Sequence, residues 1–331
     1  MAVLRIGCPD YYQTIKNVIF LPESEQSYFT SALIIANINI FLYIFIIINK
    51  YMPTQRFKSF FKDYSTNVDQ ADNQYFWKLS DDIIQSIIEK NIGNQINKNT
   101  TILDAGGGTG RWILKFSKKY QCNFILYDLS TSMLEVAKNK DSIKKLGDKI
   151  RIVNGDLENM SAIKDASIDY VTSIYNPISF VKNVEKVFSE FNRILKKDGL
   201  IMVMGQGYYN ALYSKINNYV ADTKELEELL GKSLVSWNKS VPKLKVFTKE
   251  TLEKLATSNN LYPVKTYGIP IFAQPQFEDF DSENKQKSPL SNKLEIDNKF
   301  YKAVFEIEMA FNSQDSVVNR GMNLMIVAKK K

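Results

Sequence analysis

The chain of 331 residues contains no histidine, and this absence removes several classes of chemistry. Histidine is the commonest general base and metal ligand, and it activates the serine or cysteine nucleophile of many hydrolases. Cysteine is nearly as scarce, because only Cys8 and Cys122 are present, in no spacing typical of a metal site. The sequence therefore predicts no metal site and no disulfide framework, and it favours a reducing compartment.

The chain also lacks a strong surplus of positive or negative charge, since it has 43 Lys and Arg residues and 36 Asp and Glu residues. A formal charge of +7 over this length is too weak to indicate a nucleic-acid partner. Hydrophobic residues make up 44% and charged residues 24% of the chain, as in ordinary globular proteins. The length fits one large domain with insertions, or a domain of roughly 200–250 residues with an accessory segment.

One long hydrophobic run, residues 31–48, lies within an N-terminal segment at 1–52. Apolar residues fill 15 of its 18 positions, and it carries no charge. As a helix it would be about 27 Å long, near the thickness of a bilayer core. Two interpretations stay open: a membrane anchor, or an element buried in the fold or in a dimer interface. Acidic residues precede the run and basic residues follow it, so an anchor would leave residues 53–331 in the cytoplasm.

The stretch 102–112, ILDAGGGTGRW, contains the densest glycine cluster of the chain. Its first residues, up to Asp104, have the pattern of a buried strand, and a helix is expected to begin near Arg111. Between them, glycine at positions 106, 107, 108 and 110 tolerates positive φ and lets backbone N–H groups at the helix N-terminus touch a ligand. A purely structural turn rarely needs four glycines in five residues, so we expect a ligand-binding turn.

Strand and helix patterns alternate five times around this turn, with short links. Ser80 is expected to cap a helix before the first strand, with Asp81 and Asp82 in its first turn. Such alternation predicts a doubly wound α/β fold with a parallel sheet that binds ligands at the carboxyl ends of its strands.

Two carboxylates follow the next strands of the predicted sheet. Asp128 ends the second strand, 18 residues after Gly110, where a carboxylate can accept hydrogen bonds from ribose hydroxyls. Asp156 ends the third strand, where it can accept a hydrogen bond from the exocyclic amine of adenine. The pattern indicates a nucleoside-bearing ligand.

Two common nucleotide motifs do not fit the turn. The dinucleotide pattern needs a glycine or alanine where Arg111 stands, and no Gly-Lys-Ser/Thr ending of a phosphate-binding loop is present. What remains is an acidic residue and three alternate glycines: Asp104, Gly106, Gly108 and Gly110. Together with Asp128 and the Gly155-Asp156 pair, this set resembles the class I S-adenosylmethionine-dependent methyltransferases.

The resemblance implies a Rossmann-like, seven-stranded, mostly parallel sheet with an antiparallel C-terminal edge strand, and S-adenosylmethionine as the cofactor. Asp104 and the glycine turn would hold the methionine part, Asp128 the ribose, and Asp156 with Leu157 the adenine edge. The implied cofactor-binding residues are Asp104, Gly106, Gly108, Gly110, Asp128, Leu129, Met133, Asp156, Leu157 and Ile174. Met133 is equally well explained as a core residue.

The C-terminal third completes the predicted methyltransferase domain at 53–331. Residues 205–245 read as helices rich in aromatic side chains, and the resemblance implies a substrate cover there, with an aromatic core as the equal alternative. Residues 274–298, which begin an insertion at 274–320, are polar and are expected to form an exposed loop. A helix at 299–311 and a final strand at 323–331 follow.

The expected function is in-line methyl transfer to a small-molecule, lipid-soluble acceptor, for which positioning and desolvation supply most of the rate. Tyr175 and Asn176 are the candidates for contact near the methyl group. From Asn176 the sequence begins like the Asn-Pro-Pro-aromatic motif of methyltransferases that act on planar amines, but Ile178 and Ser179 depart from it. Nucleic-acid and protein substrates therefore rank lower. The alternative is a non-catalytic adenosylmethionine-binding or scaffold protein.

Overall fold

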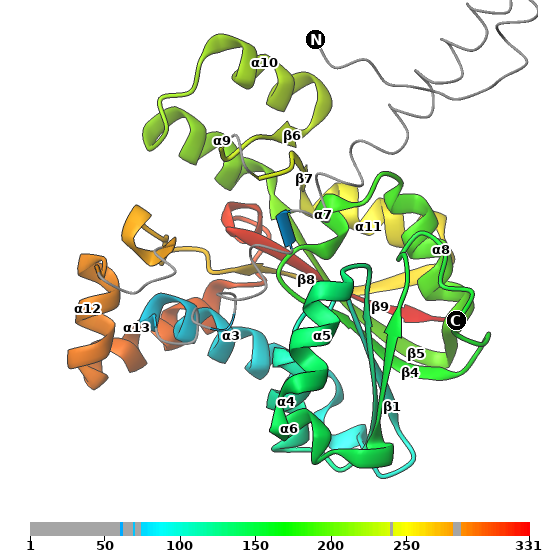
Figure 1. Ribbon diagram of the computed structural model, residues 1–331. Coiled ribbons are helices and arrows are strands. Elements are labelled where there is room, and N and C mark those ends of the chain that lie inside the picture. Colours follow the sequence, from blue (N-terminus) through cyan, green and yellow to red (C-terminus); the bar gives the residue numbers. More distant parts are fainter. Residues whose placement is uncertain (1–59, 62–68, 70–73, 239–240, 281–285) are drawn as a thin grey trace, which may run out of the picture. The chain divides into compact units, whose positions relative to one another are not determined.

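The computed structural model describes residues 60–61, 69, 74–238, 241–280 and 286–331, which carry a central sheet with helices on both faces (Figure 1). The strands are β1 (Thr101–Ala105), β2 (Asn123–Asp128), β3 (Ile150–Asn154), β4 (Ile168–Ser173), β5 (Leu195–Gly207), β6 (Leu234–Val235), β7 (Leu244–Phe247), β8 (Leu261–Ile269) and β9 (Asn323–Lys330).

Among the helices of the described residues, α3 precedes β1 and the others fall between the strands. These helices are α3 (Tyr75–Ile92), α4 (Arg111–Ser117), α5 (Thr131–Asn139), α6 (Asp141–Lys144), α7 (Pro177–Phe180), α8 (Val184–Ile194), α9 (Tyr208–Asn217), α10 (Thr223–Lys232), α11 (Lys249–Ser258), α12 (Pro289–Ile296) and α13 (Asn298–Phe311). Short 3₁₀ turns are η2 (Gly93–Gln95), η3 (Gly147–Lys149), η4 (Phe277–Phe280) and η5 (Val318–Arg320).

The main sheet has the strand order β3-β2-β1-β4-β5-β9-β8. Strands β1 to β5 are parallel, and β9 runs antiparallel to both of its neighbours, β5 and β8. The predicted α/β, Rossmann-like, mostly parallel sheet with an antiparallel C-terminal strand is therefore confirmed. The predicted number of seven strands applies to the order given above, and β7 and β6, which pair beyond the end of β5, bring the sheet of the described residues to nine strands. The structure adds that β8 is the outermost strand and that β9 lies next to it.

The two faces of the sheet bury alternate side chains, as the period of a strand requires. Ile102 of β1 belongs to a core with α3 and α4, whereas its neighbour Leu103 belongs to a core with α8 and α11. The same alternation recurs in β2 at Phe124 and Ile125. Because both faces are covered, the carboxyl ends of the parallel strands are where a ligand reaches the sheet.

The region at 205–245 contains a strand pair as well as the expected helices. β7 pairs with the end of β5 at Gln206 and Gly207, and β6 pairs antiparallel with β7. Together with α9 and α10 this pair encloses a small core of its own, formed by Ala211, Leu229, Val235, Leu244 and Val246. Two-residue strands such as β6 are too short to leave an alternating pattern in the sequence.

The expected start of the first helix at Ser80 is wrong, because α3 begins at Tyr75. Ser80 and Asp81 are buried in the middle of this helix. The backbone N–H group of Phe76, in the first turn of the helix, donates to Ser291 Oγ of α12 at 3.1 Å. A side chain from a distant segment thus satisfies the helix terminus, and no local capping residue marks it.

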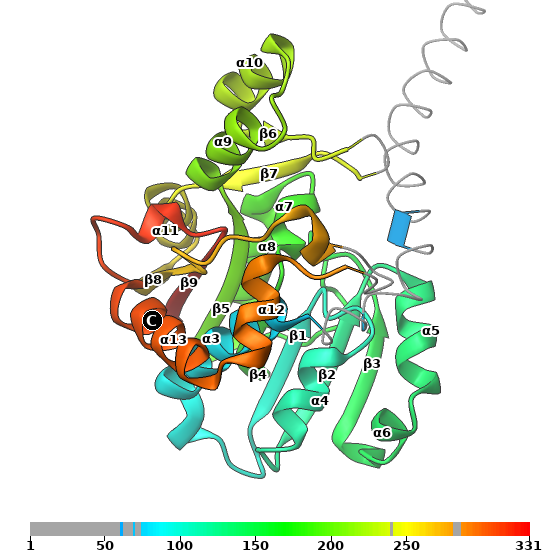
Figure 2. The ribbon, with the colours of Figure 1, turned by 90° about the vertical axis from the view of Figure 1, so that its left-hand side faces the viewer.

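The expectation of an exposed loop at 274–298 is also wrong. This stretch contains η4 and α12, and α12 lies beside α3 and α13 (Figure 2). Buried Asp279 accepts hydrogen bonds from Ser288 Oγ (2.8 Å) and Ser291 Oγ (2.5 Å), and its carbonyl accepts one from Trp77 Nε1 (2.6 Å). Polar residues of this kind normally indicate a loop, but in this stretch they form hydrogen bonds with one another in the interior.

The hydrophobic run at 31–48 lies outside the described residues, as does the whole segment 1–52. Within the part of the chain that the structure describes, no helix combines the length and the apolar character needed to cross a membrane.

Candidate cofactor-binding site

The glycine turn joins the end of β1 to the start of α4 at the carboxyl edge of the sheet. Gly106, Gly108 and Gly110 have φ values of 74°, 56° and 76°, a region that side-chain-bearing residues rarely adopt. The Gly106 N–H group donates to the carbonyl of Tyr127 in β2 at 2.7 Å. A Cβ atom on Gly106 would lie 2.5 Å from Pro177 Cβ, so glycine is also required for space.

Asp128, at the end of β2, is fixed against this turn. Its Oδ2 accepts a hydrogen bond from the Gly108 N–H group at 2.9 Å, and its Oδ1 accepts one from the Ser130 N–H group at 2.7 Å. Burial raises the pKa of this carboxyl group, and the two backbone hydrogen bonds oppose that effect. The carboxylate is therefore held beside the glycine turn, as the sequence predicted for a ribose contact.

Asp104, in β1 directly before the turn, is buried and only partly satisfied. Its Oδ1 accepts a hydrogen bond from Thr172 Oγ1 at 3.2 Å, whereas its Oδ2 has no partner among the described residues. Burial raises the pKa of Asp104 to about 7. An unpaired buried carboxylate oxygen is costly, and an ammonium group such as that of methionine would satisfy it.

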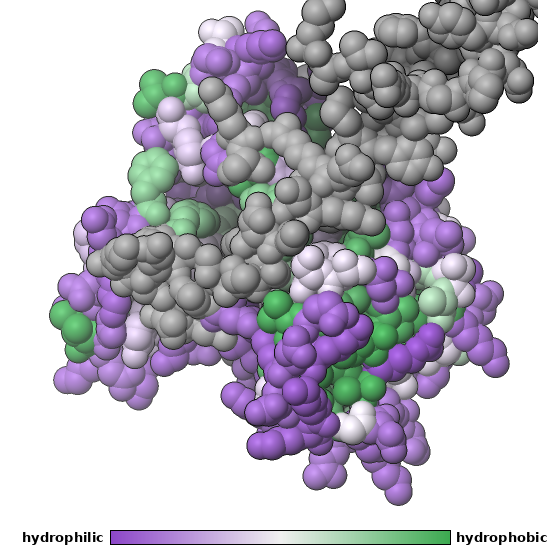
Figure 3. Space-filling model, in the orientation of Figure 1, coloured by the Kyte–Doolittle hydropathy of each residue, from purple (hydrophilic) through white to green (hydrophobic). Residues whose placement is uncertain are grey.

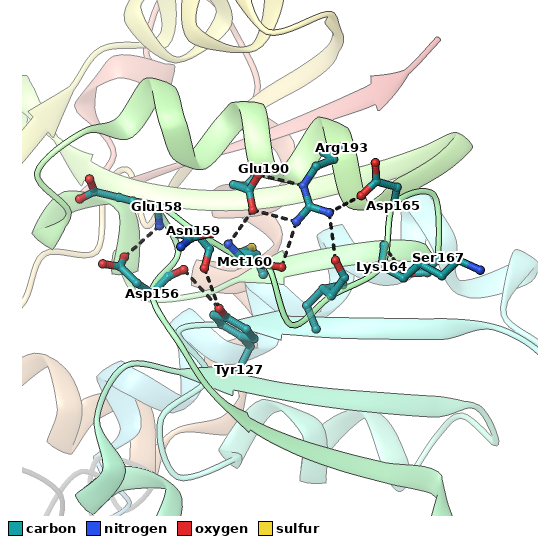
Figure 4. A network of polar contacts seen from close by, with 11 residues as sticks. Tyr127, Asp156, Glu158, Asn159, Met160, Lys164, Asp165, Ser167, Glu190 and Arg193 are labelled. Atoms are coloured by element: carbon teal, nitrogen blue, oxygen red, sulfur yellow. Dashed lines mark hydrogen bonds and ion pairs between the residues drawn. The ribbon is translucent and has the colours of Figure 1, made fainter.

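Asp156 and Leu157 begin a loop after β3 that α8 holds in place (Figure 4). Arg193 of α8 donates to the carbonyls of Met160 and Ile163, both at 2.9 Å, and pairs with Glu190 at 2.8 Å. Asp156 itself is exposed, and its Oδ1 accepts a hydrogen bond from the Glu158 N–H group at 2.9 Å. This network fixes the loop that carries the two residues predicted to contact adenine.

Three further predicted residues lie around the turn. Met133 of α5 is buried, and its sulfur is 3.8 Å from where a Cβ atom on Gly108 would lie. Leu129 is half-buried, and its carbonyl accepts a hydrogen bond from Asn154 Nδ2 at 3.0 Å. Ile174 is buried at the end of β4, in the core with α4.

Tyr175 and Asn176 follow β4 in an unusual backbone conformation, with φ values of 59° and 69°. The Tyr175 hydroxyl group donates to Asp81 Oδ1 of α3 at 2.5 Å. Burial and the nearby Asp81 raise the pKa of Tyr175 well above its usual value. The phenol therefore keeps its proton at neutral pH, which suits positioning better than it suits a general base.

Asp81 is a site residue that the sequence did not reveal. Its Oδ2 pairs with Arg111, the first residue of α4, and with Lys115 Nζ at 3.1 Å. It thereby joins the end of β4, through Tyr175, to the helix that follows the glycine turn. The signal in the sequence was an Asp-Asp pair in a helix whose other buried positions are mostly isoleucine.

Asp69 provides a contact from outside the sheet. Its Oδ1 accepts a hydrogen bond from Thr109 Oγ1 of the glycine turn at 2.7 Å, and its Oδ2 pairs with Lys140 Nζ at 2.6 Å. Lys140 also donates to the Thr109 carbonyl at 2.9 Å. Asp69 and Lys140, the residue after α5, thus both hold the turn at Thr109.

Comparisons with known proteins agree with this geometry. Residues 102–199 match the family model described as a methyltransferase domain. A ubiquinone/menaquinone biosynthesis C-methyltransferase of Rickettsia prowazekii is 28% identical over 156 residues, which are 42% of this chain and 62% of the relative. A tRNA 5-carboxymethoxyuridine methyltransferase of Escherichia coli is 25% identical over 120 residues, 36% of this chain and 44% of the relative. The chain thus spans less than two thirds of these curated relatives.

A similar fold occurs in a methyltransferase of Haloferax volcanii solved in complex with the Trm112 methyltransferase activator. That structure has a TM-score of 0.50 and 13% sequence identity, and the match covers 81% of this chain and 96% of the other. The match over residues 102–199 and the fold of the described residues support a class I S-adenosylmethionine-dependent methyltransferase domain in this chain. Such a domain implies S-adenosylmethionine as the cofactor, and the unpaired Asp104 oxygen and the glycine cradle fit the methionine end of that molecule. The roles of individual residues stay predictions.

Replacing Asp128 by alanine is expected to weaken binding of S-adenosylmethionine by about 1–3 kcal/mol, because the ribose would lose its hydrogen bonds and Gly108 its carboxylate acceptor. Isothermal titration of the purified protein measures this change. Asp141→Ala, an exposed carboxylate in α6, serves as the control and should bind as the wild type does. Unchanged affinity in the Asp128 variant would reject the ribose assignment.

Binding of S-adenosylmethionine is expected to strengthen by about fivefold from about pH 6 to about pH 7, because the pKa of Asp104 is raised to about 7 and the α-ammonium group of the ligand keeps its proton in this range. Below this pKa the carboxyl group is neutral and cannot pair with an ammonium group; above it the carboxylate can. Titrations across this pH range measure the effect. Asp104→Asn should bind more weakly with a flat profile, and a flat profile in the wild type would contradict the pairing.

Proposed function

We propose that the protein transfers the methyl group of S-adenosylmethionine to a small, lipid-soluble acceptor. The observation that supports this acceptor class is a row of aromatic rings that leads from the region at 205–245 to the end of β4. In order, the rings are Trp237, Tyr219, Phe277, Phe280, Trp77 and Tyr175, and the ring of Trp112 lies beside that of Tyr175.

Successive rings of this aromatic row lie in contact or within one helical turn. Tyr219 is 5.3 Å from Phe277 between ring centroids, and Phe280, at the other end of η4, is 5.5 Å from Trp77. Phe277 and Phe280 are 61% and 57% exposed. Figure 3 shows hydrophobic surface beside α9 within a mostly hydrophilic face. Exposed aromatic side chains that continue inward to a buried site suit an apolar ligand.

The aromatic row ends at Tyr175, next to the cofactor-binding residues. When bound, S-adenosylmethionine supplies an electrophilic methyl group on a sulfonium ion. Aromatic faces attract such a cation and exclude water from the transfer path. Tyr175 keeps its proton and Asp81 holds its ring in place, so the chain contributes orientation and desolvation, and the acceptor provides its own nucleophile. The name of the Rickettsia relative, a ubiquinone/menaquinone biosynthesis C-methyltransferase, agrees with an acceptor of this kind.

Incubation with methyl-labelled S-adenosylmethionine tests the acceptor class. Separate incubations contain a lipid extract, a polar extract and total tRNA, and label is expected in the lipid fraction. Phe280→Ala should raise the KM for that fraction by roughly 2- to 10-fold, since one aromatic contact is lost. Phe311→Ala, a similarly exposed ring on α13 outside the aromatic row, is the matched control. Label found only in tRNA or polar compounds would contradict the proposal, and cofactor binding without any transfer would favour a non-catalytic binding protein.

A second part of this proposal concerns residues 31–48, which lie outside the described residues. The apolar run at 31–48 would anchor the enzyme to the membrane that dissolves its acceptor, with the methyltransferase domain on the cytoplasmic side. Fractionation compares the full chain with a form that lacks residues 1–52. Recovery of both in the soluble fraction without detergent, with equal activity, would reject the anchor.

A further inference from the structure

Three amide side chains meet where β4, β5 and β9 come together. Asn176 Nδ2 donates to Asn323 Oδ1 at 2.6 Å and to Gln206 Oε1 at 3.5 Å. Gln206 and Asn323 are direct partners in the antiparallel register of β5 and β9. We call Asn176, Gln206 and Asn323 the amide cluster; none of its members is more than 9% exposed.

The amide cluster leaves one hydrogen-bond donor and one acceptor unused. Asn176 Oδ1 and Asn323 Nδ2 are buried and have no partner among the described residues. Gln206 is committed, because its Nε2 donates to the Met322 carbonyl at 2.9 Å and its N–H group to Ser179 Oγ at 3.0 Å. If both asparagine amides were turned over, the contact would again use one oxygen and one nitrogen, so a carbonyl oxygen and an NH₂ group would still be free. The cluster therefore has an unused donor and an unused acceptor in either orientation of the two asparagine amides.

The position of the amide cluster relates it to the cofactor site. Asn176 directly precedes Pro177, the residue that fills the space next to Gly106 of the glycine turn. Asn176 is also the second of two residues held at positive φ, a conformation that persists where the surroundings enforce it and that is common at ligand sites. On its other side, Tyr175 ends the aromatic row.

We propose that the amide cluster binds the polar group of the methyl acceptor, and that this group is uncharged and carries both a donor and an acceptor, as a hydroxyl does. The inference rests on the proposed function. The free Asn323 NH₂ group would donate to the hydroxyl oxygen, and the free Asn176 carbonyl would accept its hydrogen. All hydrogen bonds of the three amides go to uncharged groups, so a charged ligand would be buried there without a counter-ion.

This assignment divides recognition of the acceptor between two surfaces. The aromatic row contacts its apolar body, and the amide cluster fixes the orientation of its polar end. Amides neither take up nor release protons near neutral pH, so the cluster orients the acceptor and does not activate it. Asn176, Gln206 and Asn323 are thus specificity-determining residues.

Direct binding of model compounds tests the amide cluster independently of methyl transfer. The full chain, saturated with S-adenosylhomocysteine, is titrated with naphthalene, 1-naphthol and 1-naphthoate, which share a ring system and differ in the polar group. We expect 1-naphthol to bind at least about fivefold more tightly than naphthalene, the ratio given by one net hydrogen bond, and naphthoate more weakly than naphthol.

In Asn323→Leu the preference for naphthol over naphthalene should disappear, while the affinity for naphthalene changes less than about twofold. If this variant does not fold, Asn323→Asp retains the bond from Asn176 and removes the free donor, and it should also lose most of the preference. Asn312→Leu replaces another buried asparagine, whose side-chain amide donates to Met309 Sδ, and this variant should keep the preference for naphthol. Equal binding of naphthol and naphthalene by the wild type, no binding of either, or an unchanged preference in both Asn323 variants would overturn the inference. Failure of methyl transfer itself would appear separately, in the labelling experiment.

Discussion

Asp81→Ala is expected to lower the free energy of unfolding by about 3–5 kcal/mol, because it removes a buried carboxylate that pairs with Arg111 and Lys115. The side chain of Asp81 is only 3% exposed and that of Arg111 only 12%. Tyr175 also loses the acceptor of its 2.5 Å hydrogen bond. Chemical denaturation followed by circular dichroism measures the loss.

The same substitution should weaken cofactor binding, although Asp81 does not line the predicted cofactor contacts. Arg111 is the first residue of α4, where its charge lies at the positive end of the helix dipole, and Asp81 offsets that repulsion. Without Asp81 both the start of α4 and the Tyr175 backbone lose their support. Titration with S-adenosylhomocysteine in conditions where the variant is folded separates this effect from stability.

The neighbouring residue provides a matched control. Asp82 lies on the same helix, is half-buried and accepts one hydrogen bond, from the Tyr301 hydroxyl group at 2.6 Å. Asp82→Ala should cost only about 0.5–1.5 kcal/mol and leave cofactor affinity unchanged. Equal effects at the two positions would show that Asp81 has no special role in joining β4 to α4.

The parts of the site that could be predicted from the sequence consist of residues that lie close together in the sequence or at the ends of successive strands. Asp104 and the three alternate glycines lie within seven consecutive residues, and Asp128 follows at the end of the next strand. In a parallel sheet the carboxyl ends of neighbouring strands lie at one edge, so strand order alone brings these residues together. The structure places Gly108 and Asp128 in direct contact on this principle.

The parts that could not be predicted depend on pairings between distant segments. Asn323 meets Asn176 across 147 positions, and Ser291 satisfies the free N–H group of Phe76 across 215. Hydrophobic periodicity does not report such contacts, because the residues involved are polar and their partners are set only when the chain has folded. For the same reason Ser80 resembled a cap and residues 274–298 resembled a loop.

Gly106→Ala is expected to abolish cofactor binding and to lower the free energy of unfolding by about 2–5 kcal/mol. Two costs add: an alanine at a φ of 74° is strained by about 1–2 kcal/mol, and its methyl group overlaps Pro177, an overpacking cost of about 1–3 kcal/mol. Pro177 cannot retreat easily, because it begins α7 directly after the two residues held at positive φ. Titration with S-adenosylmethionine and denaturant unfolding measure the two effects.

Gly147→Ala separates strain from crowding. Gly147 also has a positive φ, of 54°, but no atom lies within 4 Å of where its Cβ would be. It should therefore show the backbone cost alone, about 1–2 kcal/mol, with wild-type affinity for the cofactor. The difference between the two variants measures how closely Pro177 must approach the glycine turn.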